Sequence, residues 1–292
     1  MTAPARVALA TSAMGLAFDA DLPLMLEALR ARGVDAVAAP WDAQSFDWSQ
    51  CAAVVIRSTW DYAERWPEYL AWADAVQGAT RLDNPAGLVR WNTDKRYLGE
   101  LAGCGVPVVP TRFIAPGEAL VLPEHGQFVV KPAVSAGSRD TARYAEHHHD
   151  LAAGHVAALH AAGSTAMVQP YLSRIDEGER ALVFLGGVFS HALRKGPVLT
   201  DVGVVDNDRA PHPDLVPHRA STAELALAGA ALAAVPGARP LLFARVDIAT
   251  ADDGTPVLME LELVEPNLFM AHSEHGLRRF ADLVRERAAA DH

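Results

Sequence analysis

The sequence predicts an α/β fold with additional α+β lobes, and three observations support this prediction. Residues 6–83 alternate short apolar strands with helices, residues 241–264 form two strand-like runs around a turn, and 50% of the 292 residues are hydrophobic. Strands that alternate with helices are typical of parallel sheets, whereas two neighbouring strands around a tight turn are typical of a hairpin. A chain of this length can bury a substantial core in two or three small lobes.

The charge balance and the cysteines narrow the class of protein. The net charge is -11, and an acidic surface does not attract phosphate backbones or anionic headgroups, so we expect no nucleic-acid or membrane partner. Cys51 and Cys104 have neither metal-site nor redox spacing, which indicates free buried thiols in a reducing compartment. We find no basic leader followed by an apolar run and no apolar segment of membrane-spanning length. A cytoplasmic protein is predicted, as a monomer or a homo-oligomer.

The first part of the chain is predicted to be a small α/β domain. Short apolar strands are expected at 7–10, 35–39 and 52–57, with a helix at 21–32 that Gly33 ends. This alternation predicts a parallel sheet. Ligands of such sheets bind at the loops that follow the carboxyl ends of the strands.

The loop after the third strand reads Arg-Ser-Thr-Trp-Asp-Tyr over residues 57–62. Its polar groups are candidates to orient a small amino acid, with Arg57 facing the carboxylate and Asp61 the ammonium group. Ser58 and Thr59 are the other candidate substrate contacts in this loop. A structural interpretation is equally open, in which Ser58 or Thr59 caps a helix and the two aromatic side chains pack.

A helix and a strand are expected in the segment that follows. The helix carries Lys95, begins after the loop at 84–85 and ends at Gly103. The strand is expected at 106–111, in a run of valines and prolines.

A candidate phosphate site comes next. The apolar strand 127–132 ends with Lys131 and Pro132 and leads into a loop of small residues at 133–139. Such a loop suits phosphate binding, because backbone N–H groups can approach oxygens that no bulky side chain shields. The Walker A pattern is absent, and no predicted strand is followed by the G-x-G-x-x-G pattern of nicotinamide-binding domains.

Three adjacent histidines, residues 147–149, are predicted to begin a solvated helix rather than to bind a metal. Adjacent residues point in different directions in a helix or a strand, so one metal ion cannot easily use all three. The alanine-rich helix 151–162 follows them.

Two cations end one of the following strands. Strands are expected at 167–172, 181–185 and 188–193. Glu179 stands at the entry to the second strand, and Arg194 and Lys195 end the third. Alone, the two cations are typical of a surface charge pair. Together with the two earlier lysines, they suit a clamp on a polyphosphate.

The C-terminal hairpin concentrates carboxylates within apolar runs. Its strands are expected at 241–248 and 256–264, around an Asp-Asp-Gly turn. Glu260 and Glu262 are two residues apart and project from one face, and Asp247 can face them from the other strand. Unpaired burial of such charges costs several kcal/mol each. A Mg2+ ion, with its coordination completed by substrate phosphates, would offset this cost. Glu265 is a further candidate ligand, and a strand face with surface ion pairs is the structural alternative.

The order of these parts resembles the ATP-grasp family of carboxylate-amine ligases across essentially the whole chain. That family has an N-terminal Rossmann-like α/β domain, a central lobe and a C-terminal lobe, with ATP between the last two. The resemblance implies domains at 1–88, 89–167 and 168–292.

The resemblance also assigns residues to the nucleotide. It matches Lys95 and Lys131 to the central-lobe lysines that touch the phosphates, and the loop with Ser135, Gly137 and Ser138 to the mobile loop above them. The remaining matches are to the hinge that meets adenine and to the ribose-binding acid. They are Gln169, Pro170, Tyr171 and Leu172 for the hinge and Glu179 for the acid.

The reaction centre follows in the same way. Arg194 or Lys195 matches the basic residue near the γ-phosphate, and with Arg245 they are the candidate catalytic residues. Asp247, Glu260 and Glu262 match the magnesium ligands, although the family commonly has asparagine at the last position. Asn267 is a candidate substrate contact, in a segment that lacks the usual glycine after its proline.

The activity implied by the resemblance is transfer of the γ-phosphoryl group of ATP to a carboxylate, followed by attack of a nitrogen on the acyl phosphate. The segments VVIRSTWDY, NTDKRYL, VVKPAVSAGS and LMELELVEPN are most similar to the branch that contains D-cycloserine synthetase. That branch implies closure of O-ureido-D-serine to D-cycloserine, an antibiotic, by a cyclo-ligase that uses ATP and Mg2+. An intermolecular amino-acid or peptide ligase, a non-catalytic nucleotide-binding protein and a nicotinamide or sugar-nucleotide enzyme are the alternatives.

Overall fold

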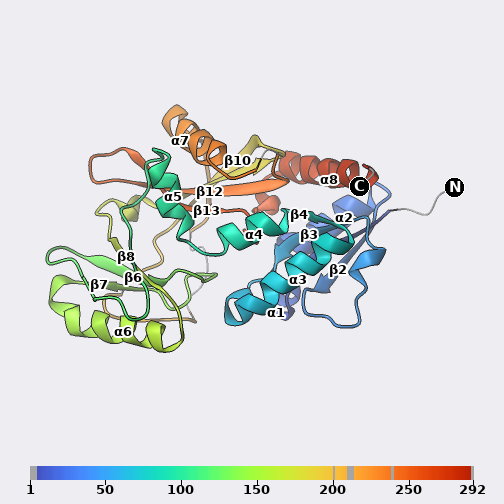
Figure 1. The fold of residues 1–292 in the computed structure, drawn as a ribbon. Helices are drawn as coiled ribbons and strands as arrows, with labels where there is room; N and C mark the ends of the chain where they lie inside the picture. The colour runs from blue at the N-terminus through green and yellow to red at the C-terminus, as the bar shows by residue number, and fades with distance from the viewer. Residues whose placement is uncertain (1–4, 200, 209–213, 238–239, 291–292) are drawn as a thin grey trace.

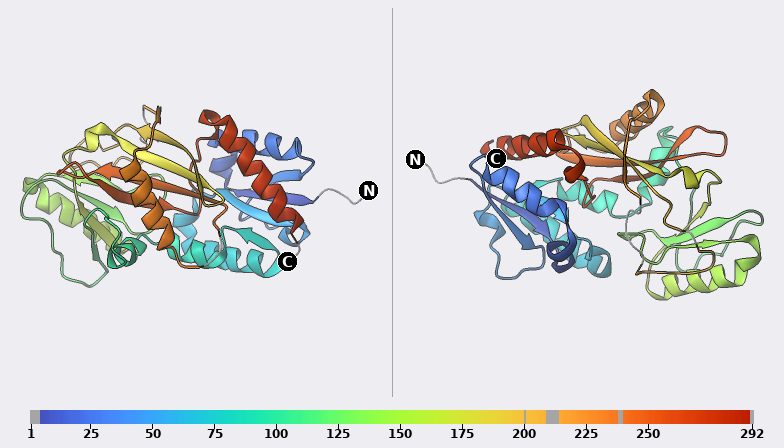
Figure 2. Two further views of the ribbon diagram at one scale, coloured as in Figure 1. Left: turned by 90° about the horizontal axis from the view of Figure 1, so that it is seen from above. Right: turned by 180° about the vertical axis from the view of Figure 1, so that it is seen from behind.

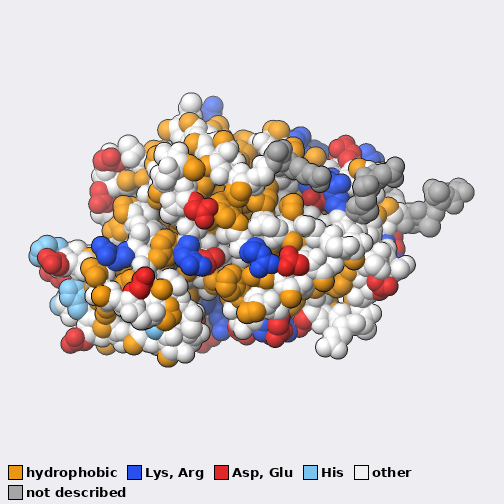
Figure 3. Space-filling view, in the orientation of Figure 1, with side chains coloured by type: hydrophobic (Ala, Val, Ile, Leu, Met, Phe, Trp, Pro, Cys, Tyr) orange, Lys and Arg blue, Asp and Glu red, His pale blue; other side chains and the backbone are white. Residues whose placement is uncertain are grey.

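The computed structural model describes residues 5–199, 201–208, 214–237 and 240–290, which form three sheets and the helices around them (Figure 1). The N-terminal and central sheets lie toward opposite ends of the molecule, and the C-terminal sheet lies between them in all views (Figure 2). On the face drawn in Figure 3, Lys and Arg side chains lie beside Asp and Glu side chains. None of the described helices is long and apolar enough to span a bilayer.

The N-terminal sheet is parallel, as predicted, with the strand order β2-β1-β3-β4. Its strands are β1 (Arg6–Thr11), β2 (Asp35–Pro40), β3 (Ala53–Ser58) and β4 (Arg81–Asp83). Around them lie α1 (Ala13–Phe18), α2 (Asp21–Arg30), α3 (Trp66–Ala79), η1 (Trp48–Gln50) and η2 (Tyr62–Arg65). Every residue of β3 is buried, which is typical of a parallel strand covered on both faces.

The C-terminal helix α8 (Glu274–Ala289) returns to the N-terminal domain and packs against α2 (Figure 1). Met25 and Leu29 of α2 share one core with Phe280 of α8 and with Phe243 of the C-terminal lobe. Burial of side chains of this size stabilises the fold by about 1.5–3 kcal/mol each. The first and last parts of the chain are therefore joined by a common core.

The central sheet is antiparallel, with the order β5-β8-β6-β7. Its elements are β5 (Arg112–Ile114), β6 (Phe128–Pro132), β7 (Ala142–Tyr144), η3 (Glu146–His148), α6 (His149–Ala161) and β8 (Ala166–Pro170). Val156 and Leu159 of α6 pack on Phe128 and Val130 of β6. The three adjacent histidines lie where α6 begins, as predicted.

The C-terminal sheet is antiparallel, with the order β11-β10-β9-β12-β13. Its strands are β9 (Glu179–Leu185), β10 (Val188–Lys195), β11 (Val216–His218), β12 (Phe243–Thr250) and β13 (Pro256–Glu262). The other elements of this lobe are η4 (Ile175–Glu177), α7 (Thr222–Ala233) and η5 (Met270–His272). Strands β12 and β13 form the predicted hairpin around the Asp-Asp-Gly turn.

Three local predictions are wrong. Residues 106–111 form no strand beyond a single bridge from Val108 to Leu258, because the prolines on either side of Val108 and Val109 have no N–H for a ladder. The helix expected around Lys95 is two helices, α4 (Ala86–Asn92) and α5 (Tyr97–Gly103). Cys104 is a free thiol as expected but is exposed, at the end of α5.

The break between α4 and α5 has a physical cause. The side chain of Asn92 donates to the carbonyl of Leu261 and accepts from the N–H of Leu263, which fixes the end of α4 on β13. The N–H of Lys95 then donates to the carbonyl of Ala133 at 2.8 Å instead of continuing the helix. These tertiary hydrogen bonds aim Lys95 at the loop that follows β6.

Candidate active site

A cavity of about 980 Å3 lies between the central and C-terminal sheets. It brings together most of the predicted site residues. They are Lys95, Lys131, Ser135, Gly137, Ser138, Gln169, Pro170, Tyr171, Leu172, Glu179, Lys195, Arg245, Asp247, Glu260, Glu262 and Asn267. Arg57, Ser58, Thr59, Asp61 and Arg194 are not among its described lining residues.

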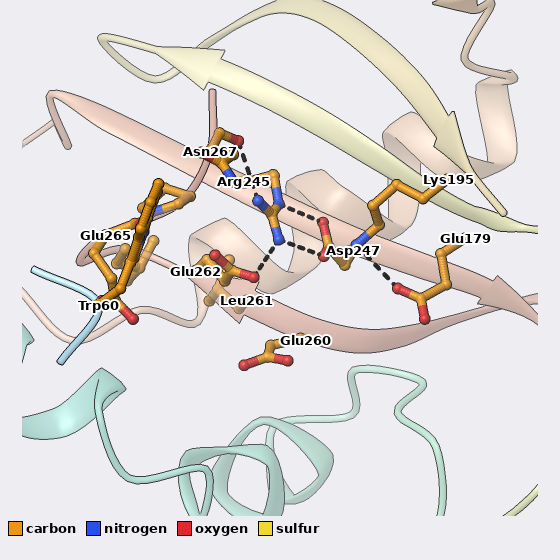
Figure 4. A network of polar contacts seen from close by, with 12 residues as sticks. Trp60, Glu179, Lys195, Arg245, Asp247, Glu260, Leu261, Glu262, Glu265 and Asn267 are labelled. Carbon is orange, nitrogen blue, oxygen red and sulfur yellow. Dashed lines mark hydrogen bonds and ion pairs between the residues drawn. The ribbon is translucent and has the colours of Figure 1, made fainter. Parts of the chain in front are cut away.

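Asp247 lies at the centre of the charged network (Figure 4). Its carboxylate receives Arg245 Nε at 2.8 Å and Lys195 Nζ at 2.5 Å, and Lys195 also contacts Glu179 at 3.0 Å. Arg245 extends the network to Glu262, which lies opposite it on β13. Burial alone would raise the pKa of Asp247, but Arg245 and Lys195 outweigh it and hold this pKa well below its usual range.

The two predicted phosphate lysines lie near Glu260. Lys95 Nζ is 3.2 Å from its carboxylate and donates to the carbonyl of Ser135 at 2.7 Å. Burial lowers the pKa of Lys131, and Lys95 acts in the same direction while Glu260 opposes them. These two lysines therefore lie at the end of β6, where the small-residue loop 133–139 begins.

Two other carboxyl groups in the cavity hold protons more tightly than usual. Burial raises the pKa of Glu262 to about 7, although Arg245 opposes the shift. Burial raises the pKa of Glu265 to about 8, and the neighbouring Glu262 adds to the shift. Among the candidate magnesium ligands, the pKa values of Asp247 and Glu260 are lowered, so these two carry negative charge more readily than Glu262 and Glu265.

The oxygen atoms of the predicted magnesium ligands are suited to a hard cation, although these carboxylates are paired with Lys and Arg side chains in the structure. Asp247 faces Glu260 across the hairpin, as predicted, and Glu262 follows on the same strand. Within the described ranges, no three His, Cys, Asp or Glu side chains gather as a ready-made metal site. Carboxylate oxygens completed by phosphate oxygens are typical ligands of Mg2+. A cation at Glu262 would have to replace its contact with Arg245.

The small-residue loop is tied to both neighbouring domains. Gly137 and Ser138 adopt φ values of 64° and 60°, which make the turn of the loop. Arg139 pairs with Glu64 of the N-terminal domain at 2.6 Å. Asp140 and Asn207 of the C-terminal lobe exchange two hydrogen bonds of 2.8 and 3.0 Å. The loop thus closes one side of the cavity.

The predicted hinge lies at the end of β8. The guanidinium carbon of Arg143 is 3.7 Å from the centroid of the Tyr171 ring, which is a cation–π contact. The N–H of Tyr171 donates to the carbonyl of Gln127 at 2.8 Å, so this N–H is already engaged. The side chain of Gln169 donates to Thr111.

The structure separates the two cations at the end of β10. Lys195 is buried and lines the cavity, whereas Arg194 does not. Consecutive strand residues point to opposite faces, so only one of the two can reach the site. Of these two cations, Lys195 therefore remains a catalytic candidate, together with Arg245.

The structure does not bring the expected acceptor loop, residues 57–62, into the cavity as a set. Arg57 is 1% exposed and is bound by Asp19 and Asp21. The other members are engaged in the fold: Ser58 bonds to Thr11, Thr59 to Tyr69, and Asp61 to Trp41. Only Trp60 of this loop lines the cavity. Of the structural interpretation, the packing of Tyr62 is confirmed, whereas neither Ser58 nor Thr59 caps a helix with its side chain.

The sequence prediction missed Asp21 and Phe269, which line the cavity together with Trp60. Asp21 starts α2, in the connection that follows the carboxyl end of β1. The rule that ligands meet these ends of parallel strands would have pointed to it. No local pattern marks Phe269, whose left-handed φ of 53° turns the chain after Asn267.

Comparisons with known proteins agree with this architecture. Residues 7–84 match the family described as D-cycloserine synthetase DcsG, N-terminal domain. The chain is 43% identical over 296 residues to "Cycloserine biosynthesis protein DcsG" of Streptomyces lavendulae, covering 96% of this chain and 98% of that protein. The chain belongs to the ATP-grasp ligases related to DcsG.

Solved structures support the same assignment. The crystal structure of D-cycloserine synthetase DcsG superposes with a TM-score of 0.88 at 40% identity, covering 97% of this chain and 99% of the other. The ATP-grasp ligase PsnB, solved with a minimal precursor, Mg and ADP, shares the fold with a TM-score of 0.63 at 16% identity, covering 99% of each chain. The predicted α/β ATP-grasp fold is confirmed. The chain is thus an ATP-dependent ligase that forms C–N bonds.

Proposed function

We propose that this ATP-grasp ligase uses ATP and Mg2+ to activate the carboxylate of O-ureido-D-serine and closes it to D-cycloserine. The observation that carries the proposal is the 43% identity to DcsG over nearly the whole of both chains. The acceptor end of the cavity adds support, because it offers carboxyl and amide groups suited to a small polar substrate, including Glu265 and Asn267.

The charged network suits phosphoryl transfer. Lys95, Lys131 and Lys195 are the cations that would neutralise the phosphate oxygens, and Arg245 would stabilise the carboxylate oxygen that receives the γ-phosphoryl group. Their positions around one cavity support these roles.

Binding of Mg2+ is expected when ATP draws the lysines away from the carboxylates. When phosphates recruit the lysines, Glu260 loses Lys95 and Asp247 loses Lys195, so that only Arg245 still compensates the buried charge of Asp247. A buried carboxylate without a partner is costly, so a divalent cation becomes favourable only with ATP present. Bound there, Mg2+ would neutralise charge that develops on the transferred phosphoryl group.

The ring would close within one pocket. The acyl phosphate and the attacking ureido nitrogen belong to the same molecule, so holding both ends raises the effective concentration of the nucleophile. Water must be kept from the acyl phosphate meanwhile. Trp60 and Phe269 supply apolar surface at this end of the cavity.

We also propose a division of the chain into domains at 1–88, 89–167 and 168–292. The boundary between the last two is best moved to follow Pro170, because all of β8 pairs with β5 and β6 of the central lobe. A cytoplasmic location, where ATP is supplied, is part of the proposal.

The test is product analysis with ATP, Mg2+ and O-ureido-D-serine, with O-ureido-L-serine as the matched substrate control. We expect ADP, phosphate and a cyclic product from the D-enantiomer without any second amine. A linear amide that requires a second amino acid would establish the intermolecular ligase instead. Nucleotide binding without phosphate release over a broad panel of carboxylates would contradict the ligase role.

A further inference from the structure

Arg57 forms a buried node between two distant parts of the chain. Its Nη2 contacts Asp19 Oδ1 at 3.0 Å, in the connection between α1 and α2, and Asp21 Oδ2 at 3.2 Å, at the start of α2. Its Nη1 donates to the carbonyl of Pro266, 209 residues away, and Nη2 also lies 3.4 Å from Asn267 Oδ1. One guanidinium therefore holds the α1–α2 connection and the segment after β13 together.

The segment 265–272 is attached to the N-terminal domain at two further points. The N–H of Met270 donates to Asp21 Oδ1 at 2.8 Å, and Trp60 Nε1 donates to the carbonyl of Glu265 at 3.1 Å. Phe269 lies between them in the left-handed region, a conformation that a non-glycine residue keeps only when its surroundings hold it. Glu265 and Asn267 of this segment line the acceptor end of the cavity, beside Arg245 (Figure 4).

Stability alone does not explain the node. Two carboxylates face one guanidinium, and among the described residues Asp19 Oδ2 and Arg57 Nε find no hydrogen-bond partner. Apolar side chains of similar volume often stabilise a fold as well as a buried ion pair does. What apolar side chains cannot supply is a rigid fork of donors that sets the distance between three separate backbone segments.

We propose that Arg57 is a positioning residue for the acceptor substrate, which fixes the segment 265–272 against the N-terminal domain without touching the substrate itself. The inference rests on the ligase reaction proposed above. A displacement of this segment by about 1 Å would move Glu265 and Asn267 relative to the phosphates, and such a shift can lower kcat/KM for the acceptor by roughly 100-fold. The phosphate-binding lysines and the hinge lie on other elements, and the segment meets the reaction centre through the carbonyl of Asn267, which accepts from Arg245 Nη1 at 3.1 Å.

The first test is independent of the substrate. Hydrogen exchange followed by mass spectrometry should show lost protection of the peptide that contains 265–272 in Arg57→Lys, because a lysine retains the charge but cannot make the same set of contacts. Arg287→Lys is the matched control, because Arg287 also joins the two ends of the chain, through Asp83 and the carbonyl of Pro240, and does not line the cavity. Unchanged protection in Arg57→Lys would overturn the inference.

The second test is kinetic. For Arg57→Lys we expect KM for the acceptor to rise by about tenfold or more while KM for ATP changes by less than about twofold, which a general loss of stability would not produce. An equal rise in both KM values would overturn the inference. Should Arg57→Lys fail to fold, Asp19→Asn removes one partner of the node with little change in shape and should give smaller changes in the same direction.

The two proposals can fail separately. If the wild-type protein forms no cyclic product, the proposed function fails, and exposure of 265–272 in Arg57→Lys would still support the positioning role. If the wild-type protein cyclises the substrate and Arg57→Lys leaves both exchange and KM unchanged, only the positioning role fails.

Discussion

Glu260→Gln should separate the chemistry of the site from its stability. Glu260 Oε1 lies 3.2 Å from Lys95 Nζ, with side-chain exposures of 27% and 7%. The amide keeps the shape and an accepting oxygen but loses the charge. The amide oxygen can still accept from the charged Lys95, but the attraction between two opposite charges is lost, so the fold should lose roughly 1 kcal/mol. This corresponds to a fall in Tm of about 2–4 °C.

The effect on turnover should be much larger. A carboxylate that holds a catalytic cation is worth several kcal/mol of transition-state stabilisation, so kcat should fall by about 100- to 1,000-fold. Release of phosphate from ATP with the acceptor present measures turnover, and thermal melts measure stability. Glu177→Gln is the control, because Glu177 pairs with Arg174 at 2.7 Å on the surface and should change neither by much. A Glu260→Gln enzyme with kcat within about twofold of wild type would refute the assignment.

Three further variants test other parts of the structure. Lys131→Met should weaken ATP binding by about tenfold in calorimetry, because a charge-assisted contact to phosphate is lost, and unchanged affinity would remove Lys131 from the site. The pKa of Glu265 is raised from 4.5 to about 8, so its contribution to stability is fully present below pH 4.5 and is lost as pH rises through about 8. Glu265→Gln should flatten this fall in thermal melts, and an unaltered pH profile would contradict the raised pKa. Asn84→Ala should lower the free energy of unfolding in urea by about 3 kcal/mol, because Asn84 makes three hydrogen bonds to buried backbone groups of the C-terminal lobe; a loss below about 1 kcal/mol would show that those groups find other partners.

Local pattern was sufficient for several features of the fold and the site. The alternation of apolar strands and helices predicted the parallel N-terminal sheet, and the Asp-Asp-Gly turn predicted the hairpin. Both follow from short-range rules of backbone geometry. Side-chain alternation then placed Glu260 and Glu262 on one face of β13, and Asp247 faces Glu260 as expected. Lys131 at the end of a strand before a small-residue loop was visible in the same way.

Other features depended on contacts between distant segments. The helix expected around Lys95 is broken because Asn92 bonds to β13, about 170 residues later in the chain. The two cations at the end of β10 look equivalent in the sequence, but only Lys195 points into the cavity. Which face of a strand meets the ligand is decided by the lobe that packs opposite it, and no pattern within the strand reports that packing.

Arg57, near the part of the cavity assigned to the acceptor substrate, shows most clearly what the sequence could not predict. By itself the sequence determined that Arg57 ends a buried strand at the ligand-binding edge of the sheet, and this position suggested a substrate contact. Only the tertiary structure decided that Asp19, Asp21 and the carbonyl of Pro266 enclose its guanidinium. The physical reason is that a buried and an exposed arginine have the same local sequence signature. Their difference lies in the charges and carbonyl groups that the rest of the chain brings within hydrogen-bonding distance.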